Sequence, residues 1–137
     1  MKQMLIFLIL VSPFIVNGQE KIDPSKLPLT PYKPHVVING FHHRDTTQLN
    51  TLLEYGLQVV LDDNSFKVIQ FDVIFDCPSH SLLDFSMKRY IGNRVYPGDD
   101  YFKKRLFDGN FISIENTVIE KHGIRFRMKS FDLMILK

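Results

Sequence analysis

The sequence has one cysteine, no long uninterrupted hydrophobic run and almost no excess of one charge. A single cysteine cannot form an intrachain disulfide, so the stability of the domain must come from its core. The longest apolar run covers residues 4–16 and is interrupted by Ser12 and Pro13, and its length of about 13 residues falls short of the roughly 20 that a transmembrane helix needs. Seventeen basic residues nearly balance fifteen acidic ones. This balance argues against a nucleic-acid partner, because nucleic-acid-binding proteins concentrate basic charge on one face.

Three interpretations of Cys77 remain open. It can be a small buried residue at the end of a strand, a site of intermolecular pairing, or a nucleophile. The nearest histidine in the sequence, His80, follows Pro78 and Ser79, so no helical geometry positions it against the thiol. We therefore expect Cys77 to mark the end of a core strand.

The first 18 residues have the composition of a secretory signal peptide. Lys2 precedes the apolar run, which closes on the small-residue pattern Val16-Asn17-Gly18 expected at a signal-peptidase site. A membrane anchor is the alternative, and the length of the run disfavours it. Cleavage would remove Lys2 and leave sixteen basic against fifteen acidic residues. We expect a periplasmic or secreted protein with no membrane span after cleavage.

Four prolines lie within residues 19–34. Pro28, Pro31 and Pro34 fall at every third residue, which matches the three-residue turn of a polyproline II helix. We interpret residues 19–34 as a proline-rich extended leader, with a proline-motif ligand as the alternative. The rest, residues 35–137, has the length of one folding unit.

From residue 35 onward, short apolar runs rich in phenylalanine, valine and isoleucine alternate with turn residues, a texture that favours strands. Asn39-Gly40 predicts a turn, because both residues adopt positive φ at little cost. Gly56 should end a short helix that Thr46 or Thr47 caps. The expected elements are strands at 35–38 and 57–61, a turn at 62–64 and a helix carrying Leu49, Leu52 and Leu53.

The longest expected strand of the N-terminal half covers residues 66–75. Its side chains alternate between two faces. Pro78 cannot donate a hydrogen bond to a sheet, so this strand should end at Asp76-Cys77. One face carries Ile69, Phe71, Val73 and Phe75, and the other carries Gln70 and Asp72. Phe66, Val68 and Ile74 also lie on the second face, so both ends of the strand should be partly covered.

The C-terminal half is expected to add a return strand, a helix and three further strands. Asp99 and Asp100 favour a helix start, and Gly109 lies just beyond the expected end. Phe102 and Leu106, four residues apart, should dock this helix on the sheet. The strands are predicted at 82–91, 110–119, 124–129 and 130–136, with a turn at 120–123. The sum is an all-β fold, an immunoglobulin-like antiparallel β-sandwich of six or seven strands with one or two short helices.

The main candidate binding site consists of four basic residues, Lys121, Arg125, Arg127 and Lys129. A two-residue step of about 6.6 Å would align the last three as a stripe along one strand. The residues between them, Ile124, Phe126 and Met128, would face inward. Two interpretations stay open: a solvated face paired with Glu115 or Glu120 across the hairpin, or a contact for an acidic partner.

Other candidate sites carry weaker signals. His42-His43 with Asp45 lacks third and fourth ligands at a recognisable spacing, so no metal site is expected. Asp99 and Asp100 suit a helix N-terminus better than a paired acid and base. We find no nucleophile elbow, phosphate loop or dinucleotide fingerprint in the sequence. We therefore expect no enzyme, no catalytic residue and no cofactor.

Three stretches carry a resemblance to a known family. They are ING at 38–40, GLQVVLDDNSFKVIQFDVIF at 56–75 and ISIENTVIEKHGIRFRMKSFDLMIL at 112–136. In this order they resemble the C-terminal domain of the gliding-motility protein GldM, over roughly residues 34–137. The sequence departs from the family pattern at 62–65 and in the turn at 120–123, and both positions are expected to be loops.

The resemblance implies an immunoglobulin-like sandwich that acts as a periplasmic interaction module. In GldM this domain ends a periplasmic shaft that meets outer-membrane components of the type IX secretion machinery, and motor coupling needs that shaft and its membrane anchor. We therefore carry over only the interaction role. The resemblance implies a non-enzymatic, exported protein–protein interaction module whose partner is another envelope protein. In its most specific form, this expectation links the protein to gliding or type IX secretion. The alternative is a small secreted hydrolase or carbohydrate-binding β-sandwich. Homo-oligomerisation through sheet edges also stays open.

Overall fold

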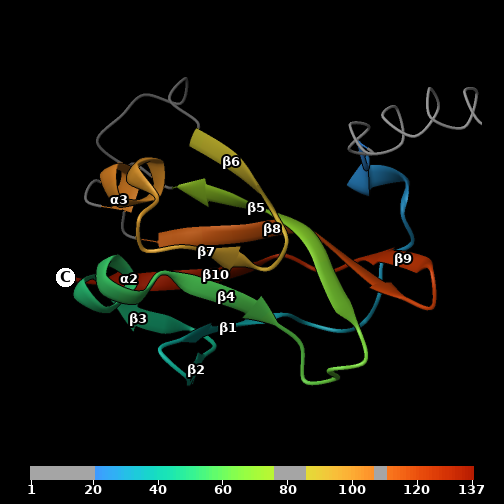
Figure 1. Ribbon diagram of the computed structural model, residues 1–137, viewed down its shortest axis with the longest axis horizontal. Coiled ribbons are helices and arrows are strands. Elements are labelled where there is room, and N and C mark those ends of the chain that lie inside the picture. The colour runs from blue at the N-terminus through green and yellow to red at the C-terminus, as the bar shows by residue number, and fades with distance from the viewer. Residues whose placement is uncertain (1–20, 76–85, 107–110) are drawn as a thin grey trace, which may run out of the picture.

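The computed structural model describes residues 21–75, 86–106 and 111–137. Within these ranges the protein is mostly β-structure, arranged as two sheets with two short α-helices (Figure 1). The two-sheet, mostly β architecture agrees with the sequence-based expectation. The predicted signal peptide, Cys77 with its neighbour His80, and Gly109 lie outside the described residues.

One sheet has four antiparallel strands in the order β2-β1-β4-β7. Its strands are β1 (His35–Ile38), β2 (Phe41–His43), β4 (Leu57–Val60) and β7 (Arg94–Val95). Asn39 and Gly40 have φ values of 50° and 80° and connect β1 to β2 as a two-residue turn. Positive φ at both positions is typical of the tight turn that matches strand twist, so the predicted turn is confirmed.

The second sheet has six strands, ordered β3-β10-β8-β5-β6 with β9 also paired to β8. They are β3 (Thr46–Gln48), β5 (Lys67–Phe75), β6 (Ser86–Ile91), β8 (Phe111–Lys121), β9 (Ile124–Arg127) and β10 (Phe131–Leu136). β3 runs parallel to β10, whereas the other pairs in this sheet are antiparallel. The predicted purely antiparallel arrangement is therefore wrong for this pair, because Thr46–Gln48 extend and pair with the distant strand β10 instead of capping a helix.

Helix α2 (Leu49–Tyr55) begins without the predicted threonine cap. Thr46 and Thr47 belong to β3, and Gln48 occupies the cap position without a side-chain hydrogen bond. The predicted end is confirmed, since Gly56 has a φ of 67° and its N–H donates to the Leu52 carbonyl at 2.8 Å. β4 starts directly after this glycine.

Helix α3 (Asp100–Leu106) begins as the sequence predicts. The Phe102 N–H donates to Asp99 Oδ1 at 2.8 Å, a side-chain N-cap. Phe102 and Leu106 are buried in the core, as their spacing indicates. Within the described ranges, neither α-helix is long and apolar enough to cross a membrane.

The hydrophobic core combines side chains of both sheets and both α-helices. In β5, Val68 joins the core in place of the predicted Ile69, because the register against β8 shifts between Val68 and Gln70. The inner residues nearer the end of β5 follow the predicted alternation. Fully buried core residues include Val36, Val59, Leu52, Phe71, Val73, Leu106, Ile112, Ile114 and Leu133.

The N-terminal segment packs on the second sheet before the predicted domain start at residue 35. Leu29 forms a parallel bridge with Arg127 of β9. The Thr30 N–H donates to the Arg127 carbonyl, and the Arg127 N–H donates to the Pro28 carbonyl, both at 2.9 Å. The short 3-10 helix η1 (Pro24–Lys26) precedes this contact, and Pro24 is buried. Part of the expected leader therefore covers the outer edge of β9.

Candidate binding sites

The structure divides the predicted basic stripe into two pairs with different surroundings. Arg125 Nε lies 2.9 Å from Glu120 Oε2, as the paired interpretation predicts. Lys121 Nζ lies 4.0 Å from Asp63 Oδ2 and 5.1 Å from the centre of the Phe66 ring. Both cations therefore have partners inside the chain, and they are weak candidates for contacting another molecule.

Arg127 and Lys129 lie in one hollow of about 440 Å³. We call it the basic hollow. Ile124, which was predicted to face inward, is 58% exposed at the start of β9, whereas Met128 is buried as predicted. The lining consists of Leu29, Glu115, Asn116, Arg127, Met128, Lys129 and Ser130.

The basic hollow forms where the ladder beside β8 is interrupted. β9 ends at Arg127 and β10 begins at Phe131, so residues 128–130 leave regular pairing. Opposite them, Asn116 has a φ of 50°, and the register between β5 and β8 shifts again between Gln70 and Asp72. Irregular strands of this kind are frequent beside functional sites, because they redirect side chains.

The charges of the basic hollow are unbalanced. Within the described residues, neither Arg127 nor Lys129 has a carboxylate within 4 Å, and Arg127 Nε is buried without a hydrogen-bond partner. The one carboxylate in the lining, Glu115, accepts a hydrogen bond from Ser113 at 3.2 Å. An anionic group entering the hollow would satisfy the guanidinium.

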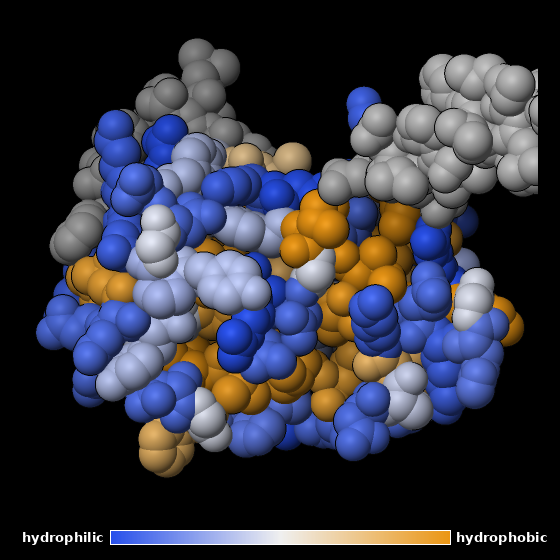
Figure 2. Space-filling view, viewed as in Figure 1, coloured by the Kyte–Doolittle hydropathy of each residue, from blue (hydrophilic) through white to orange (hydrophobic). Residues whose placement is uncertain are grey.

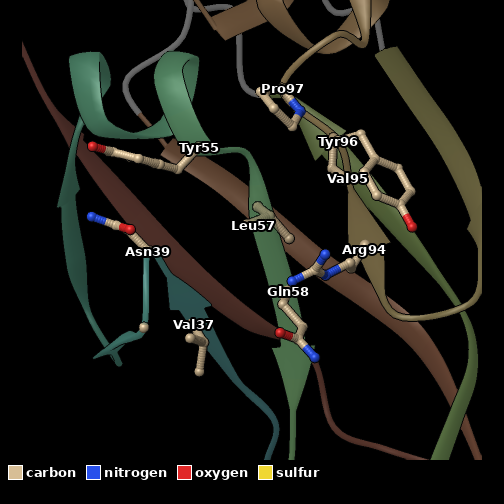
Figure 3. A pocket seen from close by; sticks show the side chains of 10 residues that line it. Val37, Asn39, Tyr55, Leu57, Gln58, Arg94, Val95, Tyr96 and Pro97 are labelled. Atoms are coloured by element: carbon tan, nitrogen blue, oxygen red, sulfur yellow. The ribbon is translucent and has the colours of Figure 1, made fainter.

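A second concave region lies on the outer face of the four-stranded sheet (Figure 3). We call this hollow of about 320 Å³ the sheet groove. Hydrophobic and hydrophilic side chains alternate over this part of the surface (Figure 2). The lining consists of Val37, Asn39, Gly40, Tyr55, Leu57, Gln58, Arg94, Val95, Tyr96 and Pro97.

Two tyrosines border the sheet groove on opposite sides. Tyr55 and Asn39 lie on one side, and Tyr96 lies on the other (Figure 3). Arg94 extends from β7 toward Leu57 between them. Tyr55 is 43% exposed and Tyr96 is 65% exposed, a high value for an aromatic side chain beside a hollow. No sequence pattern pointed to the two tyrosines as site residues, because Tyr55 comes from the end of a helix and Tyr96 directly follows the two-residue strand β7.

A further hollow of about 640 Å³ adjoins the sheet groove at the β1–β2 turn. The two hollows share Asn39 and Tyr55, and Phe41, which is 70% exposed, borders the second one. None of the described residues that line either hollow is an aspartate or a glutamate. The path across both hollows therefore offers aromatic rings, amides and hydroxyls, with Arg94 as its permanent charge.

The histidines near β2 do not form a cluster with metal-site geometry. His43 Nδ1 lies 3.1 Å from the Thr46 carbonyl, whereas His42 Nδ1 lies 2.6 Å from Nε2 of the buried His35. In the part of the chain that the structure describes, no three His, Cys, Asp or Glu side chains converge as metal ligands. Burial lowers the pKa of His35, although the nearby Asp62 opposes this shift.

An ion pair with one buried partner joins β5 and β6 of the six-stranded sheet. Asp72 is fully buried, and both of its oxygens accept hydrogen bonds from Arg89, at 2.8 and 3.0 Å. Asn116 donates a third hydrogen bond at 3.0 Å. This saturated carboxylate is a structural element, because it has little acceptor capacity left for a ligand. It also holds Asn116 in the irregular segment beside the basic hollow.

Comparison of the chain with protein-family models, with curated proteins and with solved structures finds no match. The resemblance to the GldM C-terminal domain therefore stays a prediction from sequence motifs.

Proposed function

We propose that this protein is an exported, non-enzymatic interaction module that binds an acidic segment of an envelope protein at the basic hollow. The observation that carries the proposal is the position of Arg127 and Lys129, which share one hollow while no carboxylate of the described residues pairs with them. A planar guanidinium binds carboxylates through two parallel hydrogen bonds, and a neighbouring ammonium adds to the attraction.

The rest of the basic hollow suits a peptide ligand. Leu29, which is 51% exposed, lies beside the cations, so the site offers apolar contact next to charge. Ser130 and Asn116 can exchange hydrogen bonds with a peptide backbone. Contact surfaces that combine apolar area with a few charged groups are typical of specific protein interfaces.

The resemblance to the GldM C-terminal domain gives this proposal its setting. We infer an immunoglobulin-like arrangement of the two sheets and a periplasmic or secreted location. Support comes from the positions of the motifs: ING forms the β1–β2 turn, the FKV stretch begins β5, and the Ile-Glu-Asn stretch lies within β8. The GldM-like role predicts an envelope protein as the partner.

Binding rather than hydrolysis fits the basic hollow best. Glu115 is the one carboxylate in its described lining, whereas the general mechanism of glycoside hydrolysis uses two. An acidic ligand also needs a site in which cations exceed carboxylates.

The proposal can be tested with an acidic peptide, for example hexaglutamate, and with crosslinked capture of partners from the native envelope. The double variant Arg127→Gln/Lys129→Gln should weaken peptide binding about tenfold at low salt and reduce capture of the envelope partner. Lys33→Gln/Lys104→Gln removes the same charge at exposed positions outside the hollow and serves as the control. Equal binding by both double variants would refute the site.

A further inference from the structure

Three exposed aromatic side chains border two adjoining hollows, one on the four-stranded sheet and one between its β1–β2 turn, helix α2 and strands β3 and β10. Tyr55 and Tyr96 lie on opposite sides of the sheet groove and point away from each other (Figure 3), and Phe41 borders the adjoining hollow. Single exposed aromatic residues are common on protein surfaces and need no explanation. Here, however, the rings accompany two concave regions that share lining residues. This arrangement offers flat apolar surfaces to a ligand that follows the path.

The polar lining can both donate and accept hydrogen bonds. Asn39 and Gln58 place amide groups in the sheet groove, and Gln48, Thr46 and Thr51 line the adjoining hollow. Amides and hydroxyls match ligands whose hydroxyl groups also donate and accept. A pyranose ring combines such hydroxyls with an apolar face that can stack on a tyrosine.

Arg94 supplies the charge of the sheet groove. It has no carboxylate within 4 Å among the described residues, and its guanidinium carbon lies 5.9 Å from the centre of the Tyr96 ring. This contact holds the side chain at the ring while its donors remain available. An unpaired guanidinium beside a stacking ring favours a sugar that carries a carboxylate.

The backbone of the sheet groove argues against an extended peptide as the ligand. β4 forms the floor, and it is hydrogen-bonded to β1 on one side and to β7 on the other. A peptide that adds to a sheet needs an unpaired edge, and the edge strand at this groove, β7, has only two residues. A saccharide can be bound by side chains alone.

Two tight backbone features hold the groove in shape. A Cβ at Gly56 would lie 2.1 Å from the Val95 carbonyl oxygen, so β4 and β7 approach each other closely at its floor. Asn39 occupies the two-residue turn described above, which limits its motion. A preformed site avoids part of the ordering cost of binding.

From these observations we infer that the sheet groove binds an acidic oligosaccharide containing uronic-acid units. Tyr55 and Tyr96 stack on the sugar faces, and Arg94 pairs with a uronate carboxylate. The adjoining hollow at Phe41 extends the site to further sugar units. This site is separate from the basic hollow proposed for protein binding.

Calorimetric titration of the protein after removal of residues 1–18 tests the inference, with trigalacturonate as the probe. We expect binding that falls about tenfold when the carboxylates are methyl-esterified, because esterification removes the charge and keeps the ring. Arg94→Gln should abolish the difference between the charged and esterified probes. Tyr96→Ala should weaken both probes about tenfold.

Lys104→Gln, a neutralised exposed lysine on α3, is the matched control and should bind as the original protein does. Circular dichroism of each variant establishes that it is folded. The inference is overturned if the folded original protein binds neither probe. It is also overturned if hexaglutamate competes with trigalacturonate and Tyr96→Ala leaves this competition unchanged. The Arg127→Gln/Lys129→Gln variant should keep its affinity for trigalacturonate, so the two proposed sites can fail separately.

Discussion

At the scale of single residues, the two partners of the Asp72–Arg89 ion pair differ in burial. The Asp72 side chain is 1% exposed, whereas the Arg89 side chain is 40% exposed. Removing the arginine leaves a buried carboxylate with Asn116 as its one remaining side-chain donor among the described residues. Removing the carboxylate charge leaves a guanidinium that can still reach water. The two halves of this pair should therefore differ in their effect on stability.

Arg89→Met is expected to lower the free energy of unfolding by about 3 kcal/mol, because it strands a buried charge. Asp72→Asn should cost about 1 to 2 kcal/mol, since the amide keeps an acceptor and Arg89 stays hydrated. Chemical denaturation at neutral pH measures both values. An equal loss in the two variants would contradict the unequal burial.

His35 makes stability depend on pH. It is buried, and it faces His42, Asp62 and Arg44. Burial lowers the pKa of His35 below its usual 6.5, although Asp62 opposes the shift. The folded state therefore binds fewer protons than the unfolded state below that pH, so the contribution of the neutral imidazole is complete above about pH 6.5 and is lost as the pH falls toward the folded pKa.

The original protein should lose stability as the pH falls below about 6.5, and His35→Gln should lose less because its side chain does not titrate. Denaturation midpoints at several pH values give the comparison. His122→Asn removes an exposed histidine from the turn after β8 and should keep the slope of the original protein. If the stability of the original protein and of His35→Gln changed equally with pH, another group would be responsible for the pH dependence.

At the scale of elements, the junction of α2, β4 and β7 depends on one glycine. Gly56 combines a φ of 67° with a ψ of −153°, a backbone region that is almost restricted to glycine. Its close approach to the Val95 carbonyl leaves no space for a methyl group. The end of the helix and the pairing of β4 with β7 are therefore linked at this residue.

Gly56→Ala should destabilise the protein by about 3 kcal/mol, from backbone strain together with the clash. Gly98→Ala is the matched control, because a Cβ there meets nothing within 4 Å. We expect the control to change stability by less than about 0.5 kcal/mol. Thermal unfolding measures the stability of both variants. A loss of stability in Gly56→Ala as small as in the control would mean that β7 moves easily away from β4.

Local patterns in the sequence predicted the elements that depend on local chemistry. The Asn39-Gly40 turn, the end of α2 at Gly56 and the start of α3 at Asp99 follow from residues adjacent to each element. The sequence did not reveal β3 or β7, because strands of three and two residues exist only through pairing with distant partners. Val68 occupies the core in place of Ile69 for a similar reason, because the register shift in β5 depends on its pairing with the distant strand β8.

At the scale of the whole molecule, the candidate sites show the same limit. Alternation predicted that Arg125 and Arg127 share a strand, and they do. Pairing of Arg125 with Glu120 was one of the two interpretations left open. The basic hollow needed the irregular segment at 128–130, and the sheet groove needed residues from β1, α2, β4 and β7 to meet. Such convergence depends on tertiary structure and leaves no periodic signal in the sequence.

The segment before residue 35 should contribute measurable stability. A chain that starts at residue 31 loses the two hydrogen bonds to Arg127 and the buried Pro24. We expect a loss of about 2 kcal/mol in the free energy of unfolding relative to a chain that starts at residue 21. Equal denaturation midpoints for the two chains would show that the segment does not contribute to the stability of the fold.

The contact of Leu29 with Arg127 joins two parts of the chain that are synthesised far apart in time. β3 likewise pairs with β10, the last strand. Both contacts join residues far apart in the sequence, and folds dominated by such distant pairings form over milliseconds to seconds. A chain with this topology is therefore expected to refold from denaturant more slowly than a helical domain of similar length.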